Sequence, residues 1–123
     1  MEVPDTAAGD IATVRRRKLA ATQRLLGDTI AISEADWRAT VALPGWTRAH
    51  VATHIARNAD SLRRQAEAVK SGRAAPDQPT ALDTQRELES GARRSPLDLQ
   101  IDLDTSAGRL NGTLDSLSDD DWR

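Results

Sequence analysis

Apolar residues recur with the period of an α-helix over three long stretches of this 123-residue chain, and this pattern limits the fold more than any other feature. The first helix is predicted over about residues 10–32, the second over about 48–71, and the third from about residue 96 onward. A shorter, weaker helix is predicted over residues 81–92. Because no segment gives a convincing strand, the sequence predicts an all-α protein, and its 123 residues suit one domain.

One stretch carries conflicting signals. The residues "LDLQIDLD" at 97–104 alternate with period two, which is typical of a strand. However, aspartate at alternating positions disfavours a strand, and the leucines that follow continue along one helical stripe. That stripe contains Leu99, Leu103, Leu110, Leu114 and Leu117, with Leu97 and Ile101 on the opposite side of the helix. The segment is therefore predicted to be helical.

Local signals mark where the helices begin and end. Thr47 follows the turn "LPGW" and suits the N-cap of the second helix, while Gly72 suits the position just past its end. Ser95 and Pro96 are typical of the N-cap and the first position of the third helix. Residues 73–80 contain two prolines and are predicted to be a connection.

Two nearly identical phrases, "ISEADWR" at 32–38 and "LSDDDWR" at 117–123, each follow the end of a long helix. In an up-down bundle, the ends of the first and third long helices lie at the same end of the molecule. Each phrase is therefore predicted to be a turn that leads into the next antiparallel helix. This pattern predicts a four-helix bundle in which the fourth helix is missing from the sequence.

The composition excludes several classes of function. A net charge of −2 and the absence of Phe and Tyr argue against a nucleic-acid partner, and the lack of cysteine excludes a thiolate of the protein's own. No secretory signal or spanning segment is evident, so no membrane partner and a cytoplasmic location are expected. The abundance of Ala, and of Arg over Lys, indicates a GC-rich bacterial genome.

The two histidines of the chain, His50 and His54, are four residues apart on one face of the second helix. This spacing allows two imidazoles to share a metal, but a catalytic zinc site usually has three protein ligands. His50 lies in the first turn after Thr47, where a polar role next to Trp46 is favoured over metal ligation.

His54 begins a polar strip along the second helix, which continues through Asn58, Ser61 and Gln65. An apolar strip runs beside it, formed by Val51, Ile55, Leu62 and Val69. Such a polar flank can line a hydrophilic pocket between helices, or it can simply face water. The pattern alone leaves both interpretations open.

The segment "LPGWTRAHVATHIARNADSL" resembles the signature of mycothiol-dependent maleylpyruvate isomerases, whose N-terminal domain is a DinB-like four-helix bundle. The segment "RELESGARRSPLDLQIDLDTSAGRL" and the final "LSDDDW" are similar to later parts of the same domain. The resemblance implies a flexible N-terminus over residues 1–9 and a partial bundle domain over residues 10–123. It also implies an actinobacterial source.

The resemblance implies a divalent metal, usually zinc, with His54 as a ligand and His50 as the second candidate. The remaining ligands of the family are a Glu and a His spaced E-x3-H on the fourth helix, which this sequence lacks. Mycothiol would supply the thiol, and the metal would lower its pKa so that the thiolate adds to the substrate. Arg57 and Asn58 are the candidates for binding this cofactor, and Arg48 is a further candidate for positioning anions.

Two functions follow as hypotheses. The chain belongs to an enzyme that catalyses thiol-assisted cis–trans isomerisation, or a related mycothiol transfer, on a small-molecule substrate. Alternatively, it is a truncated, non-catalytic relative that acts as a helical interaction module, forming a homodimer that covers the open groove of the bundle. Under both hypotheses the chain alone is expected to bind zinc weakly or not at all as a monomer.

Overall fold

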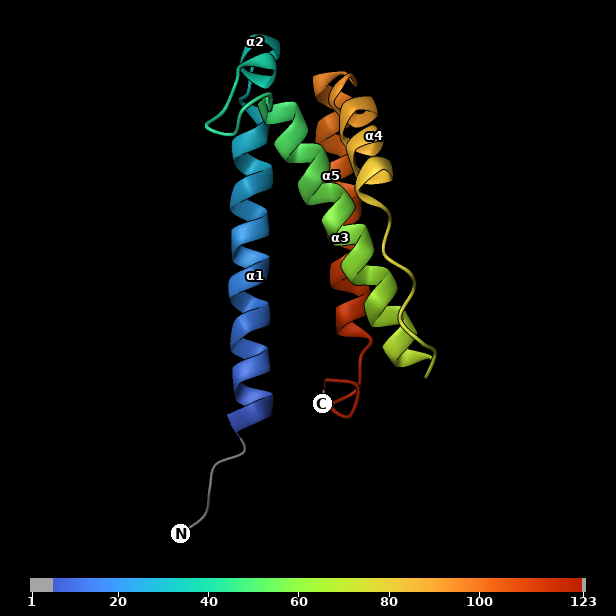
Figure 1. Ribbon diagram of the computed structural model, residues 1–123. Helices are drawn as coiled ribbons and strands as arrows, with labels where there is room; N and C mark the ends of the chain where they lie inside the picture. Colours follow the sequence, from blue (N-terminus) through green and yellow to red (C-terminus); the bar gives the residue numbers. More distant parts are fainter. Residues whose placement is uncertain (1–5, 123) are drawn as a thin grey trace.

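The computed structural model describes residues 6–122, and within this range the chain is helical with no strand (Figure 1). The all-α prediction is thus confirmed. The predicted flexible segment 1–9 falls partly outside the described residues, at 1–5, and its remainder forms the first turn of α1. The helices are α1 (Thr6–Ile30), α2 (Glu34–Arg38), α3 (Arg48–Lys70), α4 (Ala81–Ala92) and α5 (Pro96–Asp115).

The predicted caps are present. The Thr47 side chain accepts a hydrogen bond from the backbone N–H of His50 at the start of α3. The Ser95 hydroxyl accepts one from the backbone N–H of Asp98 at the start of α5, where Pro96 occupies the first helical position. After α3 the chain turns at Gly72, whose φ of 65° favours glycine. These residues act through local hydrogen bonds, which explains why sequence alone identifies them.

The long helices α1, α3 and α5 do not alternate in direction along the chain. The alternation is regular only when the shorter helix α4 is included. In Figure 1, α1 runs up, α3 runs down, α4 returns upward, and α5 runs down beside α3. The expectation that α1 and α5 end at the same end of the bundle is therefore wrong. The physical reason is that residues 73–92, predicted to be a connection and a minor helix, form a full return crossing.

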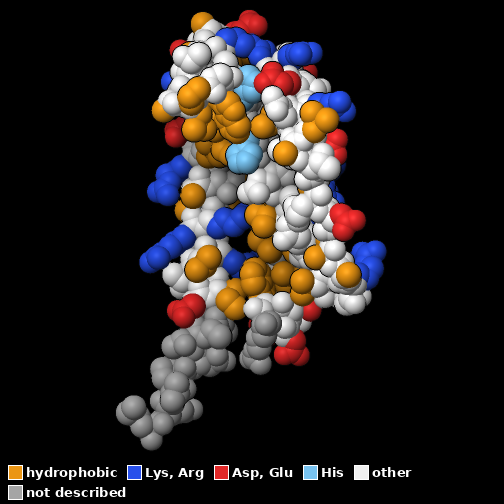
Figure 2. Space-filling model, viewed as in Figure 1, with side chains coloured by type: hydrophobic (Ala, Val, Ile, Leu, Met, Phe, Trp, Pro, Cys, Tyr) orange, Lys and Arg blue, Asp and Glu red, His pale blue; other side chains and the backbone are white. Residues whose placement is uncertain are grey.

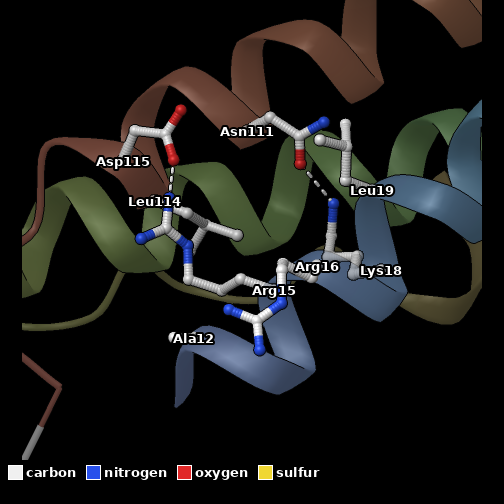
Figure 3. Close-up of a pocket in the computed structure, with 8 residues that line it drawn as sticks. All are labelled: Ala12, Arg15, Arg16, Lys18, Leu19, Asn111, Leu114 and Asp115. Atoms are coloured by element: carbon white, nitrogen blue, oxygen red, sulfur yellow. Dashed lines mark hydrogen bonds and ion pairs between the residues drawn. The ribbon is translucent and has the colours of Figure 1, made fainter. Parts of the chain in front are cut away.

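Two contacts confirm that α1 and α5 are antiparallel (Figure 3). The Lys18 ammonium donates a hydrogen bond of 2.6 Å to the side-chain carbonyl of Asn111. One turn earlier in α1, Arg15 forms an ion pair with Asp115, the last residue of α5. The N-terminal half of α1 thus lies against the C-terminal end of α5.

The two repeated phrases share a local geometry but lie at opposite ends of the molecule. In the first, the Ser33 hydroxyl caps the N–H of Asp36, and Trp37 is buried in the core. In the second, the Ser118 hydroxyl accepts a hydrogen bond from the backbone N–H of Asp121, and the backbone N–H of Ser118 donates one to the Asp121 carboxylate. There, Trp122 is half-buried beneath the Arg15 guanidinium, 6.0 Å from its ring centroid.

The core is built largely from small residues where α2, α3, α4 and α5 meet. Its buried members are Trp37, Ala49, Ala52, Ala56, Ala92, Leu99 and Leu103. Alanine lets helices approach closely, and Gly91 of α4 comes so near α3 that a Cβ at this position would overlap Thr53. Leu97 and Ile101 are exposed, as the helical interpretation of the segment 97–104 requires.

Helix α1 contributes little to this core. Its apolar residues recur with the helical period, but Val14, Leu19 and Ile30 are exposed. The stripe stays largely uncovered because α1 packs mainly against α5 and leaves an open groove between itself and α3. This apolar groove has a volume of about 180 Å³ and is lined mainly by Leu25, Leu26, Ile55, Leu62, Leu103 and Leu110.

Candidate functional site

Both histidines lie on one face of the molecule, next to gathered hydrophobic side chains (Figure 2). The capping of α3 at Thr47 sets the position of each imidazole along the helix. His50 occupies the first turn and is half-buried, whereas His54 is exposed one turn later. The two rings share a face, as predicted, but their surroundings differ.

The His50 ring is occupied at both nitrogens. Its Nδ1 accepts a hydrogen bond of 3.1 Å from the backbone N–H of Thr47, which completes a capping box. Its Nε2 lies 3.3 Å from a carboxylate oxygen of Glu89 on α4. A metal at either nitrogen would replace one of these bonds. The Trp46 ring lies 6.2 Å from the His50 ring, centroid to centroid.

The His54 ring is held differently. It packs edge-on against Trp46, with ring centroids 5.6 Å apart, and makes no hydrogen bond to any residue that the structure describes. Trp46 therefore restricts the orientation of His54 without occupying its nitrogens. Of the two imidazoles, His54 is the one available to a ligand.

His54 opens onto a polar pocket of about 260 Å³ between α3, α4 and the connection before α4. The sequence candidates Arg57 and Asn58 line the same pocket, together with Ser61 of the polar strip. The strip thus borders a hydrophilic pocket on one side and, through Asn58, the apolar groove on the other. This arrangement matches the first of the two interpretations left open by the sequence.

Arg57 reaches the pocket but is already engaged with carboxylates. Its guanidinium donates at 2.5 Å to Asp102 of α5 and at 3.2 Å to Asp60 on its own helix. Asp102 also accepts from Arg94, at 2.8 Å. The network fastens α3 to α5, and its charges are balanced within the protein.

Arg48, the other candidate for positioning anions, points away from this pocket. It donates a hydrogen bond of 3.0 Å to the backbone carbonyl of Asp36 in α2. This bond ties the start of α3 to the short helix before it.

The pocket is also lined by residues that the sequence did not single out, and four of these carry polar side chains that are not engaged with Arg57, namely Arg64, Gln78, Thr84 and Glu87. Arg64 lies three residues beyond Ser61, so its place on the polar strip is a usable sequence signal. The other three come from the connection and α4, and only the return path of the chain brings them to α3. No ion pair links Arg64 or Glu87 to any described residue.

The described residues do not form a zinc site by themselves. Within residues 6–122 no group of three His, Asp or Glu side chains is placed to hold a metal ion. Zinc bound in a catalytic site usually has three protein ligands. His54 therefore fits as a single ligand, and the rest of a coordination sphere is not found among the described residues.

None of the described helices is both long enough and apolar enough to span a bilayer.

The chain is similar to one family of known proteins, both in its sequence and in its fold. Residues 19–123 match the family model described as mycothiol maleylpyruvate isomerase N-terminal domain. The crystal structure of the mycothiol-dependent maleylpyruvate isomerase superposes with a TM-score of 0.79 at 24% identity, and that of a histidine-to-alanine mutant of this enzyme with 0.78 at 24%.

Each comparison covers 93% of this chain and 46% of the other, so the chain spans less than half the length of the isomerase. At this identity the superposition shows a shared fold. None of the curated proteins matches the sequence significantly. The family match extends over most of the chain, and the chain therefore belongs to the mycothiol maleylpyruvate isomerase N-terminal domain family.

Proposed function

We propose that this chain is the metal-binding N-terminal part of a mycothiol-dependent, isomerase-type enzyme, in which His54 is the ligand that the chain contributes. Family membership supports the enzyme class. The observation that carries the proposal is the contrast between the two imidazoles. Both nitrogens of His50 are occupied, whereas His54 is exposed, oriented by Trp46 and open to a polar pocket.

The reaction in this proposal is thiol-assisted cis–trans isomerisation of a small unsaturated acid. A thiolate adds to the double bond, the resulting single bond rotates, and loss of the thiolate restores the double bond in the trans form. The described chain contains no cysteine, and the proposal takes the thiol from a cosubstrate, for which mycothiol is the candidate. A bound zinc would favour the thiolate form of that cosubstrate.

The residues of the chain have separate tasks in this proposal. His54 holds the metal, and Trp46 keeps the imidazole facing the pocket. Asn58 offers an unoccupied side-chain amide to the cosubstrate, because it makes no side-chain hydrogen bond within residues 6–122. Arg57 positions α3 on α5 and is not assigned to the anion, since Asp102 and Asp60 already neutralise it.

Nuclear magnetic resonance of the imidazole groups during a zinc titration tests this proposal directly, because the chain has only two histidines. We expect the His54 resonances to shift in a weak, saturable manner while those of His50 stay in place. His54→Ala should remove the response. The assignment of His54 would be overturned if the His50 resonances shifted at lower zinc concentrations than those of His54. It would also be overturned if neither imidazole shifted at any zinc concentration in the titration.

A second candidate function, self-association through the groove between α1 and α3, is supported by a different observation. The groove is apolar, and Ile55 and Leu62 at its edge are 38% and 44% exposed. Exposed apolar surface of this kind is typical of contact surfaces.

Sedimentation equilibrium tests this second function, because it measures the oligomeric state of the chain. We expect a concentration-dependent dimer that Leu62→Glu abolishes. Leu97→Glu is the matched control, since Leu97 is 63% exposed on α5 and does not line the groove. A wild-type chain that stays monomeric at every concentration, or an equal effect of both variants, would exclude the groove as the dimer interface.

A further inference from the structure

The contact between α1 and α5 borders another pocket, which has a volume of about 330 Å³ (Figure 3). The ion pair of Arg15 with Asp115 bounds it on one side. The hydrogen bond of Lys18 to Asn111 bounds it on the other side. This volume lies within the range typical of small-molecule sites, about 300–1,000 Å³. Neither histidine lines this pocket, so it is separate from the site of the proposed function.

Apolar side chains form part of the wall between these two links. Leu114 of α5 lies between them in Figure 3, and Leu19 and Ala12 of α1 also line the pocket. Leu19 is 45% exposed, so the described chain covers it only in part. An apolar group bound here would remove this surface from water, which is favourable.

The pocket carries positive charge that no carboxylate of the described chain neutralises. Arg15 is neutralised by its ion pair. The Arg16 guanidinium, in contrast, donates a hydrogen bond of 3.2 Å to the Thr13 hydroxyl and has no ion-pair partner within residues 6–122. The partner of the Lys18 ammonium is the neutral amide of Asn111. Two cations of the lining, Arg16 and Lys18, therefore lack a counterion.

The hydrogen-bonding capacity that remains in the pocket lies mainly in N–H donors. Because an ammonium only donates, the carbonyl of Asn111 faces Lys18 and its NH₂ group is left over. That NH₂ group makes no hydrogen bond to any residue that the structure describes. Lys18 and Arg16 can each donate further hydrogen bonds, since an ammonium and a guanidinium carry several N–H groups. Such a set of donors favours a ligand that accepts.

The position of Lys18 strengthens this argument. The residue is half-buried, and burial lowers the pKa of its ammonium, because desolvation disfavours the charged form. A nearby carboxylate would favour the charged form, but the described chain offers Lys18 only an amide. An anion bound at this position would supply the missing interaction.

We propose that this pocket binds a small organic carboxylate, with its oxygens at Lys18 and the Asn111 amide and its apolar body against Leu19 and Leu114. Arg16 adds a second positive charge to the lining. An inorganic oxyanion could pair with Lys18 but would leave the two leucines uncovered. A neutral apolar molecule could cover the leucines but would leave the ammonium without a counterion.

Backbone-amide NMR titrations of the full chain at constant ionic strength test this site with hexanoate, hexanol and inorganic phosphate as separate probes. We expect hexanoate to shift the resonances of Lys18, Asn111 and Leu114 in a saturable manner. Hexanol lacks the charge and phosphate lacks the apolar chain, so each should bind about tenfold more weakly or less. The inference would be wrong if hexanoate left these resonances unchanged, or if either other probe bound as tightly as hexanoate.

The variant Lys18→Gln removes the charge and keeps an N–H donor. We expect it to weaken hexanoate binding by about tenfold, the loss of a hydrogen bond to a charged group. Arg17→Gln is the matched control, because Arg17 is exposed, does not line the pocket and carries the same charge. If both variants weakened binding equally, hexanoate would be attracted by the general charge of α1, and the site would be refuted.

A second variant, Asn111→Asp, tests the same site without removing Lys18. It keeps the shape of the side chain and places a carboxylate next to the ammonium, where the ligand's carboxylate is proposed to bind. We expect the hexanoate shifts to disappear, because the new carboxylate neutralises Lys18 and repels the ligand. Binding of hexanoate to Asn111→Asp with the affinity of the wild type would overturn the inference.

Discussion

Arg57 of α3 donates a hydrogen bond of 2.5 Å to Asp102 of α5, and the second oxygen of the same carboxylate accepts from Arg94 at 2.8 Å. Asp102 is 15% exposed, so water screens these interactions only in part. One carboxylate thus joins two guanidinium groups that lie 37 residues apart in sequence, 94 minus 57. This contact fixes α3, the helix that carries His54, against α5.

Replacing Asp102 tests this relationship. Asp102→Asn leaves the two guanidinium groups facing each other without their shared anion, and should lower the free energy of unfolding by about 1–3 kcal/mol. Urea denaturation followed by circular dichroism measures the change. Asp104→Asn, at an exposed position of the same helix, is the control and should stay within about 0.5 kcal/mol of wild type. A loss of the same size in both variants would contradict the role of the contact.

Gly91 and Gly108 should respond in opposite directions to alanine. A Cβ at Gly91 would overlap Thr53, so Gly91→Ala is expected to destabilise the fold by about 1–3 kcal/mol. No atom lies within 4 Å of a Cβ at Gly108, where alanine should stabilise α5 by about 0.5–1 kcal/mol. Thermal melts of both variants, and of the double variant Gly91→Ala with Thr53→Ser, measure these changes in stability. If Thr53→Ser restores no stability to Gly91→Ala, overlap with Thr53 is not the cause of the loss.

His50 is expected to act through the cap of α3. His50→Ala removes the side chain that accepts from the Thr47 N–H and should cost about 0.5–2 kcal/mol of stability. His50→Gln should recover most of this loss, because glutamine serves the same position in capping boxes. His54→Ala, at an exposed position, should change stability by less than about 0.5 kcal/mol. Equal unfolding free energies for His50→Ala and His50→Gln would refute the capping role.

Lys18 should make stability depend on alkaline pH. Burial lowers the pKa of its ammonium below the ordinary value of 10.5, because desolvation disfavours the charged form. Between the lowered pKa and 10.5 the unfolded chain binds more protons, so stability rises with pH in that window. The cost of burying the charge is therefore fully present at neutral pH and is relieved as pH increases.

The variant Lys18→Met keeps an unbranched apolar side chain in place of the lysine stem and removes the charge. We expect its Tm to exceed that of wild type at pH 7, and the difference to shrink as pH approaches 10.5. Arg17→Met, at an exposed position of α1, is the control and should show no such convergence. A difference in Tm that stays constant across the pH range would show that Lys18 is not desolvated.

Much of the local structure could be predicted because short-range interactions determine it. Thr47, Ser95 and Ser33 cap helices through hydrogen bonds to residues three positions later, so the sequence contains both partners. The helical stripe of α5 was identified correctly for a similar reason, since Leu99, Leu103 and Leu110 share one face of a single helix. The polar strip that begins at His54 also follows from the helical period alone.

The candidate site could be predicted only in part. The sequence analysis named His54, Arg57 and Asn58 as candidates, and the structure brings them to one pocket. It did not identify Asp102 as the partner of Arg57, because 45 residues separate the two and only the packing of α5 on α3 joins them. For the same reason, Thr84 and Glu87 could not be recognised as pocket residues.

By itself, then, the sequence determined the long helices, their caps, the shared face of the two histidines and the resemblance to the family, since these depend on residues close together in the chain. The tertiary structure alone decided that α4 is a return crossing, which places the two serine–aspartate–tryptophan turns at opposite ends of the bundle. It also decided that the stripe of α5 is buried while that of α1 stays largely exposed. The periodic pattern shows that a helix has an apolar face, but whether that face is covered depends on the path of the rest of the chain.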